Sequence, residues 1–263
     1  MSASPSSPDA AHPRFLEKPI LNLGGLRIAL VQLAVGMDKK KNIAAAVEQI
    51  HKAKYNGAQL VALPEFFNAP YGTKYFNEYA ESVPDGESSR ALRRAAIEAG
   101  VCVVGGTLPE RCGDDLYNTC TVWDNSGNLI AQHRKVHLFD IDIPGKITFK
   151  ESDVLSAGDH ITTFEYLGVK IGLGICYDLR FFEMAQVMSK EAYFGTWYCN
   201  LSKEDSGFLR RNSAGSATAA GLFGPHLPWC LQHDDWPSPL GAPGPSQGQR
   251  PTALGSTGQS CQR

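Results

Sequence analysis

The chain contains 263 residues, 43% hydrophobic and 20% charged, and carries a formal net charge of -2 at pH 7. This composition is typical of an ordinary globular protein with one large domain or two modest ones. There is no long basic run and no apolar stretch near the roughly 20 residues that a membrane helix needs. The sequence therefore argues against nucleic-acid and membrane partners and favours a small-molecule partner.

Residues 1–23 are expected to form a disordered lead. They contain Asp9 and Glu17 but no apolar core of the kind found in signal peptides. The single arginine of this segment, Arg14, argues against a transit peptide. These features favour a cytoplasmic location and leave a mitochondrial one open.

Short β-branched runs alternate with segments of helical periodicity from residue 24 to residue 190, which predicts one α/β domain. The first strand is expected at 27–33. The first helix is expected at 41–55, because its apolar residues recur at helical spacing and Asn56-Gly57 provides a C-cap signal. Further strands are expected at 60–63, 101–105, 116–124, 128–134 and 169–175, and further helices at 88–99 and from residue 181.

Two segments do not fit this alternation. Residues 137–159 lack clear periodicity and exceed the usual loop length, so they are either disordered or a functional loop. From residue 191 the pattern changes, and Gly, Pro, Ser and Gln dominate after residue 207. Because proline removes ladder donors and this composition buries little apolar surface, residues 191–263 are expected to form a divergent, disordered tail.

Three residues with reactive side chains follow predicted strands, which is where α/β proteins place such groups. Glu65 follows the second strand and a proline, Lys135 follows the strand at 128–134, and Cys176 follows the strand at 169–175. Taken singly, such an acid is more often a solvated loop residue and such a lysine is more often part of a wet basic surface. A single cysteine is more often a small buried hydrophobe.

Cys176 is the most informative of the three, because it lies where an apolar strand meets a following helix. Unsatisfied N–H groups at such a point favour a thiolate and can hold a developing oxyanion. The glycines around it do not complete a dinucleotide-binding fingerprint. The cysteines show no C-x-x-C pairing, and His133 and His137 lack ligand spacing, so no metal site is expected.

Three segments carry a family resemblance, and they occur in the order P-E-F-F-N-A-P-Y-G, H-R-K-V-H-L-F-D-I-D-I-P-G-K-I-T-F-K-E-S and G-L-G-I-C-Y-D-L-R-F. Together they resemble the nitrilase superfamily, also called the carbon-nitrogen hydrolases, and in particular its omega-amidase branch. The resemblance extends over about residues 26–189. It implies an α-β-β-α sandwich that forms a homodimer through helices covering the sheets.

The resemblance also implies a catalytic set. Cys176 would be the nucleophile, Glu65 the general base and Lys135 the group that stabilises the tetrahedral intermediate. Glu151 matches a second glutamate near the lysine, and the backbone N–H of Tyr177 would help to hold the oxyanion. Such a set hydrolyses an amide in two easier steps through a thioester and requires no metal or organic cofactor.

The omega-amidase resemblance implies a substrate that is a small omega-amide of a dicarboxylate, such as 2-oxoglutaramate or 2-oxosuccinamate, hydrolysed to the dicarboxylate and ammonia. The remote carboxylate of this substrate requires a cation in the pocket. Arg180 is a candidate by position, with a structural ion pair as the alternative reading. Tyr71 and Tyr75 are candidates for the pocket mouth, with ordinary packing as the alternative.

The chain departs from the family pattern after Lys190, where the family continues through helices and strands that finish the sandwich. The fold is therefore expected to be incomplete at its C-terminal end. The alternative to a working amidase is a catalytically inactive truncated isoform, at most an association partner of a complete homologue. Release of ammonia from the predicted substrates distinguishes the two.

Overall fold

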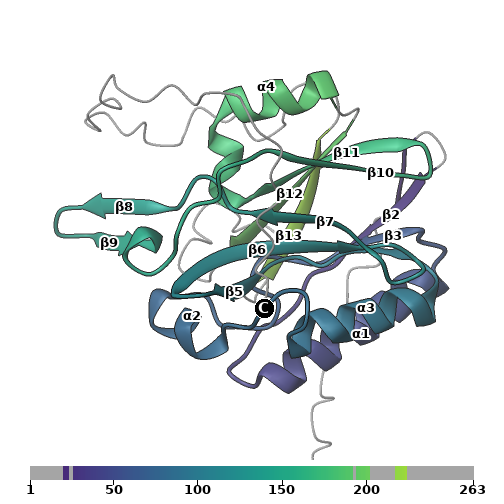
Figure 1. Cartoon of the computed structure of the whole chain (residues 1–263), viewed down its shortest axis with the longest axis horizontal. Coiled ribbons are helices and arrows are strands. Elements are labelled where there is room, and N and C mark those ends of the chain that lie inside the picture. The colour runs from purple at the N-terminus through teal and green to yellow at the C-terminus, as the bar shows by residue number, and fades with distance from the viewer. Residues whose placement is uncertain (1–19, 24–25, 192–193, 202–216, 224–263) are drawn as a thin grey trace, which may run out of the picture.

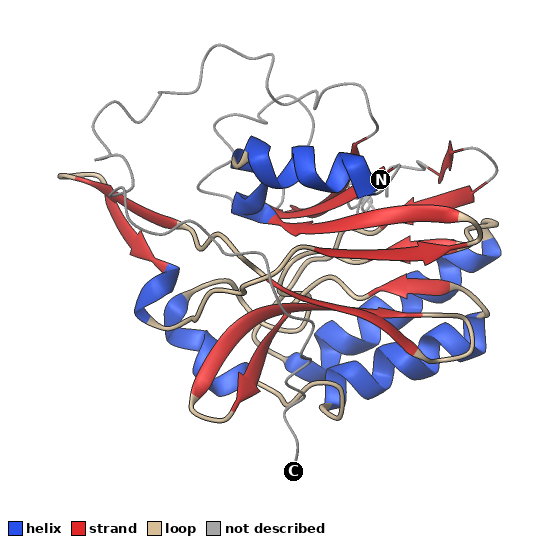
Figure 2. Cartoon of the chain, turned by 45° about the horizontal axis from the view of Figure 1, so that its top comes forward, coloured by secondary structure: helices blue, strands red, loops and turns tan. Residues whose placement is uncertain are grey.

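The computed structural model describes residues 20–23, 26–191, 194–201 and 217–223. Two β-sheets face each other, and helices lie outside both of them (Figures 1 and 2). Helices α1 (Lys39–Tyr55) and α3 (Glu87–Ala99) lie outside one sheet, and α4 (Phe182–Glu191) lies outside the other. This layering is the α-β-β-α sandwich that the sequence predicted.

The larger sheet runs in the order β1-β2-β3-β4-β6-β5, and β7 pairs with β6. Its strands are β1 (Ile20–Leu23), β2 (Leu26–Leu30), β3 (Leu60–Ala62), β4 (Cys102–Val104), β5 (Leu108–Cys112), β6 (Asp115–Trp123) and β7 (Leu129–Arg134). Strands β2, β3 and β4 pair in parallel, whereas β5, β6 and β7 pair antiparallel. A short helix, α2 (Thr73–Tyr79), and β5 were not predicted from the sequence.

The smaller sheet runs in the order β10-β11-β12-β13. Its strands are β10 (Thr162–Tyr166), β11 (Val169–Ile175), β12 (Phe194–Leu201) and β13 (Ala217–Phe223). Strand β12 is parallel to β11, and β13 is antiparallel to β12.

Both ends of the chain differ in part from the expectation. Strands β12 and β13 lie within the tail that was expected to be disordered, and β1 lies within the expected lead. The other tail residues, and residues 1–19, lie outside the described residues.

Local sequence explains the bounds of the outer helices. The Asp38 carboxylate caps α1 by accepting the N–H of Lys41 at 3.1 Å. Helix α3 ends at Gly100, whose φ of +61° is the left-handed conformation that glycine adopts without strain. No helix in the described part of the chain is both long and apolar enough to cross a membrane.

The two sheets meet through apolar faces. Ile28, Leu60 and Val104 of the larger sheet form one buried cluster with Ile171 and Leu173 of β11. Because each sheet has one face in this cluster, β3, β7 and β11 are held in the same layered block. The residues that follow these three strands carry the predicted acid, lysine and thiol.

The long segment at 137–159 is ordered, so of the two alternatives for it the disordered one is wrong. It contains a hairpin of β8 (Asp140–Ile143) and β9 (Ile147–Lys150), followed by a 3-10 turn, η1 (Glu151–Asp153). The hairpin projects from the sandwich in Figure 1. At its base, the rings of Phe149 and Tyr71 pack with centroids 5.4 Å apart.

Candidate active site

Glu65 follows β3 and is fully buried. The next residue, Phe66, has a φ of +48° and donates its N–H to the hydroxyl of Thr107 at 2.8 Å. Asn118 Nδ2 and Lys135 Nζ both donate to Glu65 Oε1, at 2.8 and 3.2 Å. Glu65 Oε2 has no hydrogen-bond partner among the described residues. One oxygen is therefore fixed, and the other is available to a reacting group.

Lys135 directly follows β7 and is also fully buried. Its Nζ lies 3.2 Å from Glu65 Oε1 and 2.9 Å from Glu151 Oε2. Burial alone would lower the pKa of this lysine, but the charges of Glu65, Cys176 and Glu151 raise it above its ordinary value. The ammonium therefore stays charged in an interior where an unpaired cation would cost several kcal/mol.

Glu151 is the buried first residue of η1. Its Oε1 accepts the hydroxyl of Tyr71 at 2.9 Å, and its Oε2 accepts the backbone N–H of Phe139 at 2.7 Å. With Lys135 as a further partner, both carboxylate oxygens are engaged. The ordered segment at 137–159 thus delivers a second carboxylate, besides Glu65, that holds the lysine.

Cys176 follows β11 and begins a short 3-10 turn, η2 (Cys176–Arg180). Its φ of +47° lies in the left-handed region, which costs a residue other than glycine about 1–3 kcal/mol. The side chain is half-buried and close enough to Lys135 to contribute to its raised pKa. The sequence placed Cys176 where a strand meets a helix, whereas in the structure the strand is followed by a single 3-10 turn.

The electrostatics of the cluster suit a proton acceptor. Burial raises the pKa of Glu65, the charge of Lys135 opposes that shift, and the charge of Glu151 adds to it. Two carboxylates share one ammonium, so protonation of Glu65 leaves the buried cluster neutral. A carboxylate in this position accepts a proton more readily than one in water.

Two further predicted residues, Tyr71 and Tyr177, lie in different surroundings. Tyr71 belongs to it through Glu151, and burial raises its pKa. Tyr177 is half-buried between the rings of Phe139 and Phe181, at 5.2 and 5.6 Å between centroids.

Tyr75 and Arg180 are less closely tied to the cluster. Tyr75 packs edge-on against Tyr79 in α2, 6.4 Å between centroids. Arg180 is exposed at the end of η2. The contacts of these two side chains therefore do not assign them to a substrate pocket.

Sequence reasoning missed Asn118. This asparagine is fully buried in β6, its side chain holds Glu65, and its backbone carbonyl accepts the N–H of Lys135 at 2.9 Å. Strand β6 also contains Asp115, Thr119 and Thr121, so the polar character of Asn118 did not single it out in the sequence. Within the described part of the chain, no group of three or more His, Cys, Asp or Glu side chains is placed to hold a metal ion.

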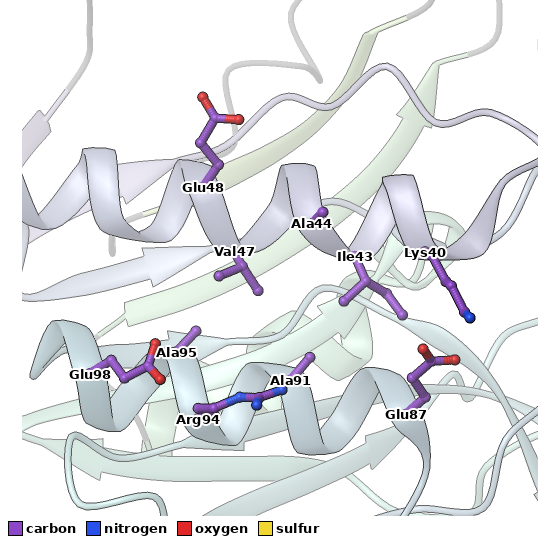
Figure 3. Close-up of a pocket in the computed structure, with 10 residues that line it drawn as sticks. All are labelled: Lys40, Ile43, Ala44, Val47, Glu48, Glu87, Ala91, Arg94, Ala95 and Glu98. Atoms are coloured by element: carbon purple, nitrogen blue, oxygen red, sulfur yellow. The ribbon is translucent and has the colours of Figure 1, made fainter.

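A groove between α1 and α3 lies away from this cluster (Figure 3). Its lining residues come only from these two helices and combine apolar side chains such as Val47 with charged ones such as Arg94 and Glu98. None of the predicted site residues lines it. The groove is therefore a feature of the outer helical layer and not of the candidate active site.

Comparison with known proteins gives one family. The sequence profile of the carbon-nitrogen hydrolases matches residues 27–194. The omega-amidase NIT2 of Xenopus tropicalis is 53% identical over 165 residues, which cover 63% of this chain and 59% of that protein. The omega-amidase NIT2 of Homo sapiens is 50% identical over 164 residues, which cover 62% of this chain and 59% of that protein. The chain thus spans 59% of the length of these curated relatives.

Solved structures show the same fold. The structure of Saccharomyces cerevisiae Nit3, a member of the nitrilase superfamily, is 33% identical in sequence to this chain and matches it with a TM-score of 0.61. The match covers 70% of this chain and 67% of that one. An amidase of Nesterenkonia, also a nitrilase superfamily member, is 18% identical with a TM-score of 0.61. That match covers 76% of this chain and 84% of the amidase, and at this identity it supports the fold alone.

Proposed function

Because the chain belongs to the carbon-nitrogen hydrolase family, we propose that it hydrolyses a small omega-amide of a dicarboxylate, of the 2-oxoglutaramate or 2-oxosuccinamate type, to the dicarboxylate and ammonia. The observation that carries this proposal is the buried lysine held between two carboxylates beside a half-buried cysteine. The relatives named omega-amidase support the choice of substrate class.

The first half of the proposed reaction forms a thioester. Glu65 Oε2 takes the proton of the Cys176 thiol, and the sulfur attacks the carbonyl carbon of the amide. As the tetrahedral intermediate collapses, the C–N bond breaks and Glu65 returns the proton to the departing nitrogen, which leaves as ammonia. Asn118 and Lys135 hold the other oxygen of Glu65, so the same Oε2 serves in both transfers.

The second half regenerates the thiol. Glu65 accepts a proton from water, the resulting hydroxide attacks the thioester carbonyl, and the C–S bond breaks. The leaving sulfur takes back the proton from Glu65. One amide and one water are consumed, and one carboxylic acid and one ammonia are formed, without an external oxidant or reductant.

Lys135 and the backbone N–H of Tyr177 stabilise the negative charge that develops on the substrate oxygen. Each tetrahedral intermediate carries a negative oxygen, and one well-placed donor at such an oxygen contributes about 3 kcal/mol. Glu151 keeps Lys135 charged and oriented through its 2.9 Å contact. We assign Glu151 this supporting role within the catalytic set.

The substrate contacts remain part of the proposal. Arg180 is the candidate partner of the remote carboxylate, and Tyr71 and Tyr75 are the candidate residues of the pocket mouth. We further propose a homodimer, as the family resemblance implies, and a cytoplasmic location.

The test is release of ammonia from 2-oxoglutaramate by the purified full chain, with Cys176→Ala as the control. Release that depends on Cys176 supports the proposal. A folded chain that releases no more ammonia than the variant from any of the omega-amides contradicts it.

One observation favours a second candidate function. The sequence departs from the family pattern after residue 190, and the chain spans 59% of the length of its curated relatives. An inactive chain that associates with a complete omega-amidase agrees with this observation. A folded but inactive chain that co-elutes with a full-length relative on size-exclusion chromatography would select this candidate over the enzyme.

A further inference from the structure

Asp178 lies two residues after Cys176, and its carboxylate is fully buried. Its Oδ2 accepts the backbone N–H of Ile175 at 2.9 Å. Its Oδ1 accepts the backbone N–H of His137 at 2.8 Å and lies 2.7 Å from Nδ1 of the same residue. The proposed mechanism does not use this carboxylate. Both of its oxygens nevertheless have hydrogen-bond partners, whereas Glu65 Oε2 has none among the described residues.

Of the two backbone groups that Asp178 accepts, one belongs to the smaller sheet and the other follows a strand of the larger sheet. Ile175 ends β11 in the smaller sheet and immediately precedes the thiol. His137 follows β7 of the larger sheet and lies two residues after the lysine. Its ring stacks on Phe181, 3.5 Å between centroids, directly after η2. The carboxylate is therefore a polar link between the two halves of the sandwich, in addition to the contact of His133 in β7 with Thr162 in β10 at 3.0 Å.

We propose that Asp178 is a positioning residue, which fixes the Cys176 thiol beside the Lys135 ammonium by binding the backbone N–H groups of Ile175 and His137. This inference rests on the proposed roles of the thiol and the lysine. Those two groups enter the site from opposite sheets, and the other described bonds of Lys135 run to Glu65, Glu151, Asn118 and Gly158.

A carboxylate is required because both of its oxygens act as acceptors for backbone donors. Asparagine offers one oxygen and one NH2 group, so it can accept from only one of the two strands and places N–H against N–H at the other. Burial opposes ionisation, but the nearby ring of His133, 3.6 Å from Oδ2, and the bonds from His137 and Ile175 hold the pKa of Asp178 at about 2. The link therefore persists throughout the pH range in which the thiol reacts.

The test is the rate at which iodoacetamide alkylates Cys176 in the full chain, followed at that peptide by mass spectrometry at pH 7.5. This readout does not need amide turnover, so failure of the proposed function and failure of this inference are distinguishable. In Asp178→Asn the thiol moves away from the lysine, and we expect at least tenfold slower alkylation. If Asp178 acted only through its charge, its neutralisation would favour the thiolate and speed alkylation.

Glu81→Gln is the matched control. Glu81 is a buried carboxylate that also accepts a backbone N–H, from Ser88 at 2.7 Å, but it lies between α2 and α3 and binds the first turn of α3. We expect the alkylation rate of Cys176 in this variant to stay within twofold of the unaltered chain. Equal slowing in both variants would overturn the inference, because loss of any buried carboxylate would then suffice.

Hydrogen exchange of the unaltered chain keeps the inference testable if Asp178→Asn does not fold. His137 lies outside any strand, so its amide is protected only by Asp178. We expect the amides of His137 and Ile175 to exchange at least a hundredfold more slowly than unprotected amides. Exchange of the His137 amide at the unprotected rate would show that the link does not exist.

Discussion

The two sheets contribute to the candidate site in different ways. The acid, the lysine and Asn118 follow or belong to strands of the larger sheet, and hydrogen bonds fix each of them. The thiol comes from the smaller sheet, on a residue with positive φ in a single turn. The larger sheet therefore orients its groups through side-chain bonds, whereas the smaller sheet orients the thiol through backbone conformation and the Asp178 link.

Loss of the thiol is the most severe way to test the smaller sheet's contribution. Cys176→Ala removes the nucleophile, so we expect turnover of 2-oxoglutaramate to fall at least about 10³-fold. Cys120→Ala is the matched control, because Cys120 is a buried thiol of β6 in the apolar cluster between the sheets. Its activity should stay within about threefold. Similar losses in the two variants would indicate structural cysteines.

Loss of the lysine tests the larger sheet. Lys135→Met preserves most of the side-chain volume but leaves two buried carboxylates without their cation. We expect kcat to fall about 10²-fold to 10³-fold, because a donor to the oxyanion is lost. The thermal midpoint should also fall, because breaking a buried ion pair costs about 3–5 kcal/mol. A variant with unchanged kcat would remove Lys135 from the catalytic set.

Asn118→Leu keeps the proposed base, Glu65, but removes one of the hydrogen bonds that orient it. The hydrogen bond from Asn118 lowers the pKa of Glu65, so its removal raises that pKa further. Glu65 acts as a base only when ionised, and the activity is lost as the pH falls through its pKa. The acidic limb of the kcat/KM profile should therefore move to higher pH, with about a tenfold loss below the limb. A uniform loss at every pH would indicate a purely structural role.

Tyr71→Phe should have the smallest effect. It removes the 2.9 Å bond to Glu151 and leaves the contacts of that glutamate with Lys135 and Phe139. We expect a loss of about 1 kcal/mol in the free energy of unfolding and a change in kcat of less than about tenfold. Denaturant titration and steady-state kinetics measure the two quantities. A larger loss than in Lys135→Met would place the tyrosine at the substrate.

The sequence predicted the layered fold and the strands that precede Glu65, Lys135 and Cys176, because strand ends and motif order are local features. It did not predict Asn118 or the link through Asp178. Asn118 acts on a partner 53 residues away along the chain, and the bond of Asp178 to His137 spans 41 residues, so neither contact is visible in a local pattern. The strands at 194–201 and 217–223 were also missed. The alanines and glycine of 217–223 are weak strand signals, whereas 194–201 has aromatic residues typical of strands but was assigned to the divergent tail.

The two carboxylates around Lys135 also affect release of the product. Hydrolysis converts a neutral amide into an acid that ionises beside Glu65 and Glu151, where only one cation is available. A carboxylate newly formed at the reacting end is repelled by the cluster, whereas the neutral amide group that it replaces is not. The same charges that prepare the base therefore favour departure of the product, and inhibition by the dicarboxylate should be weak.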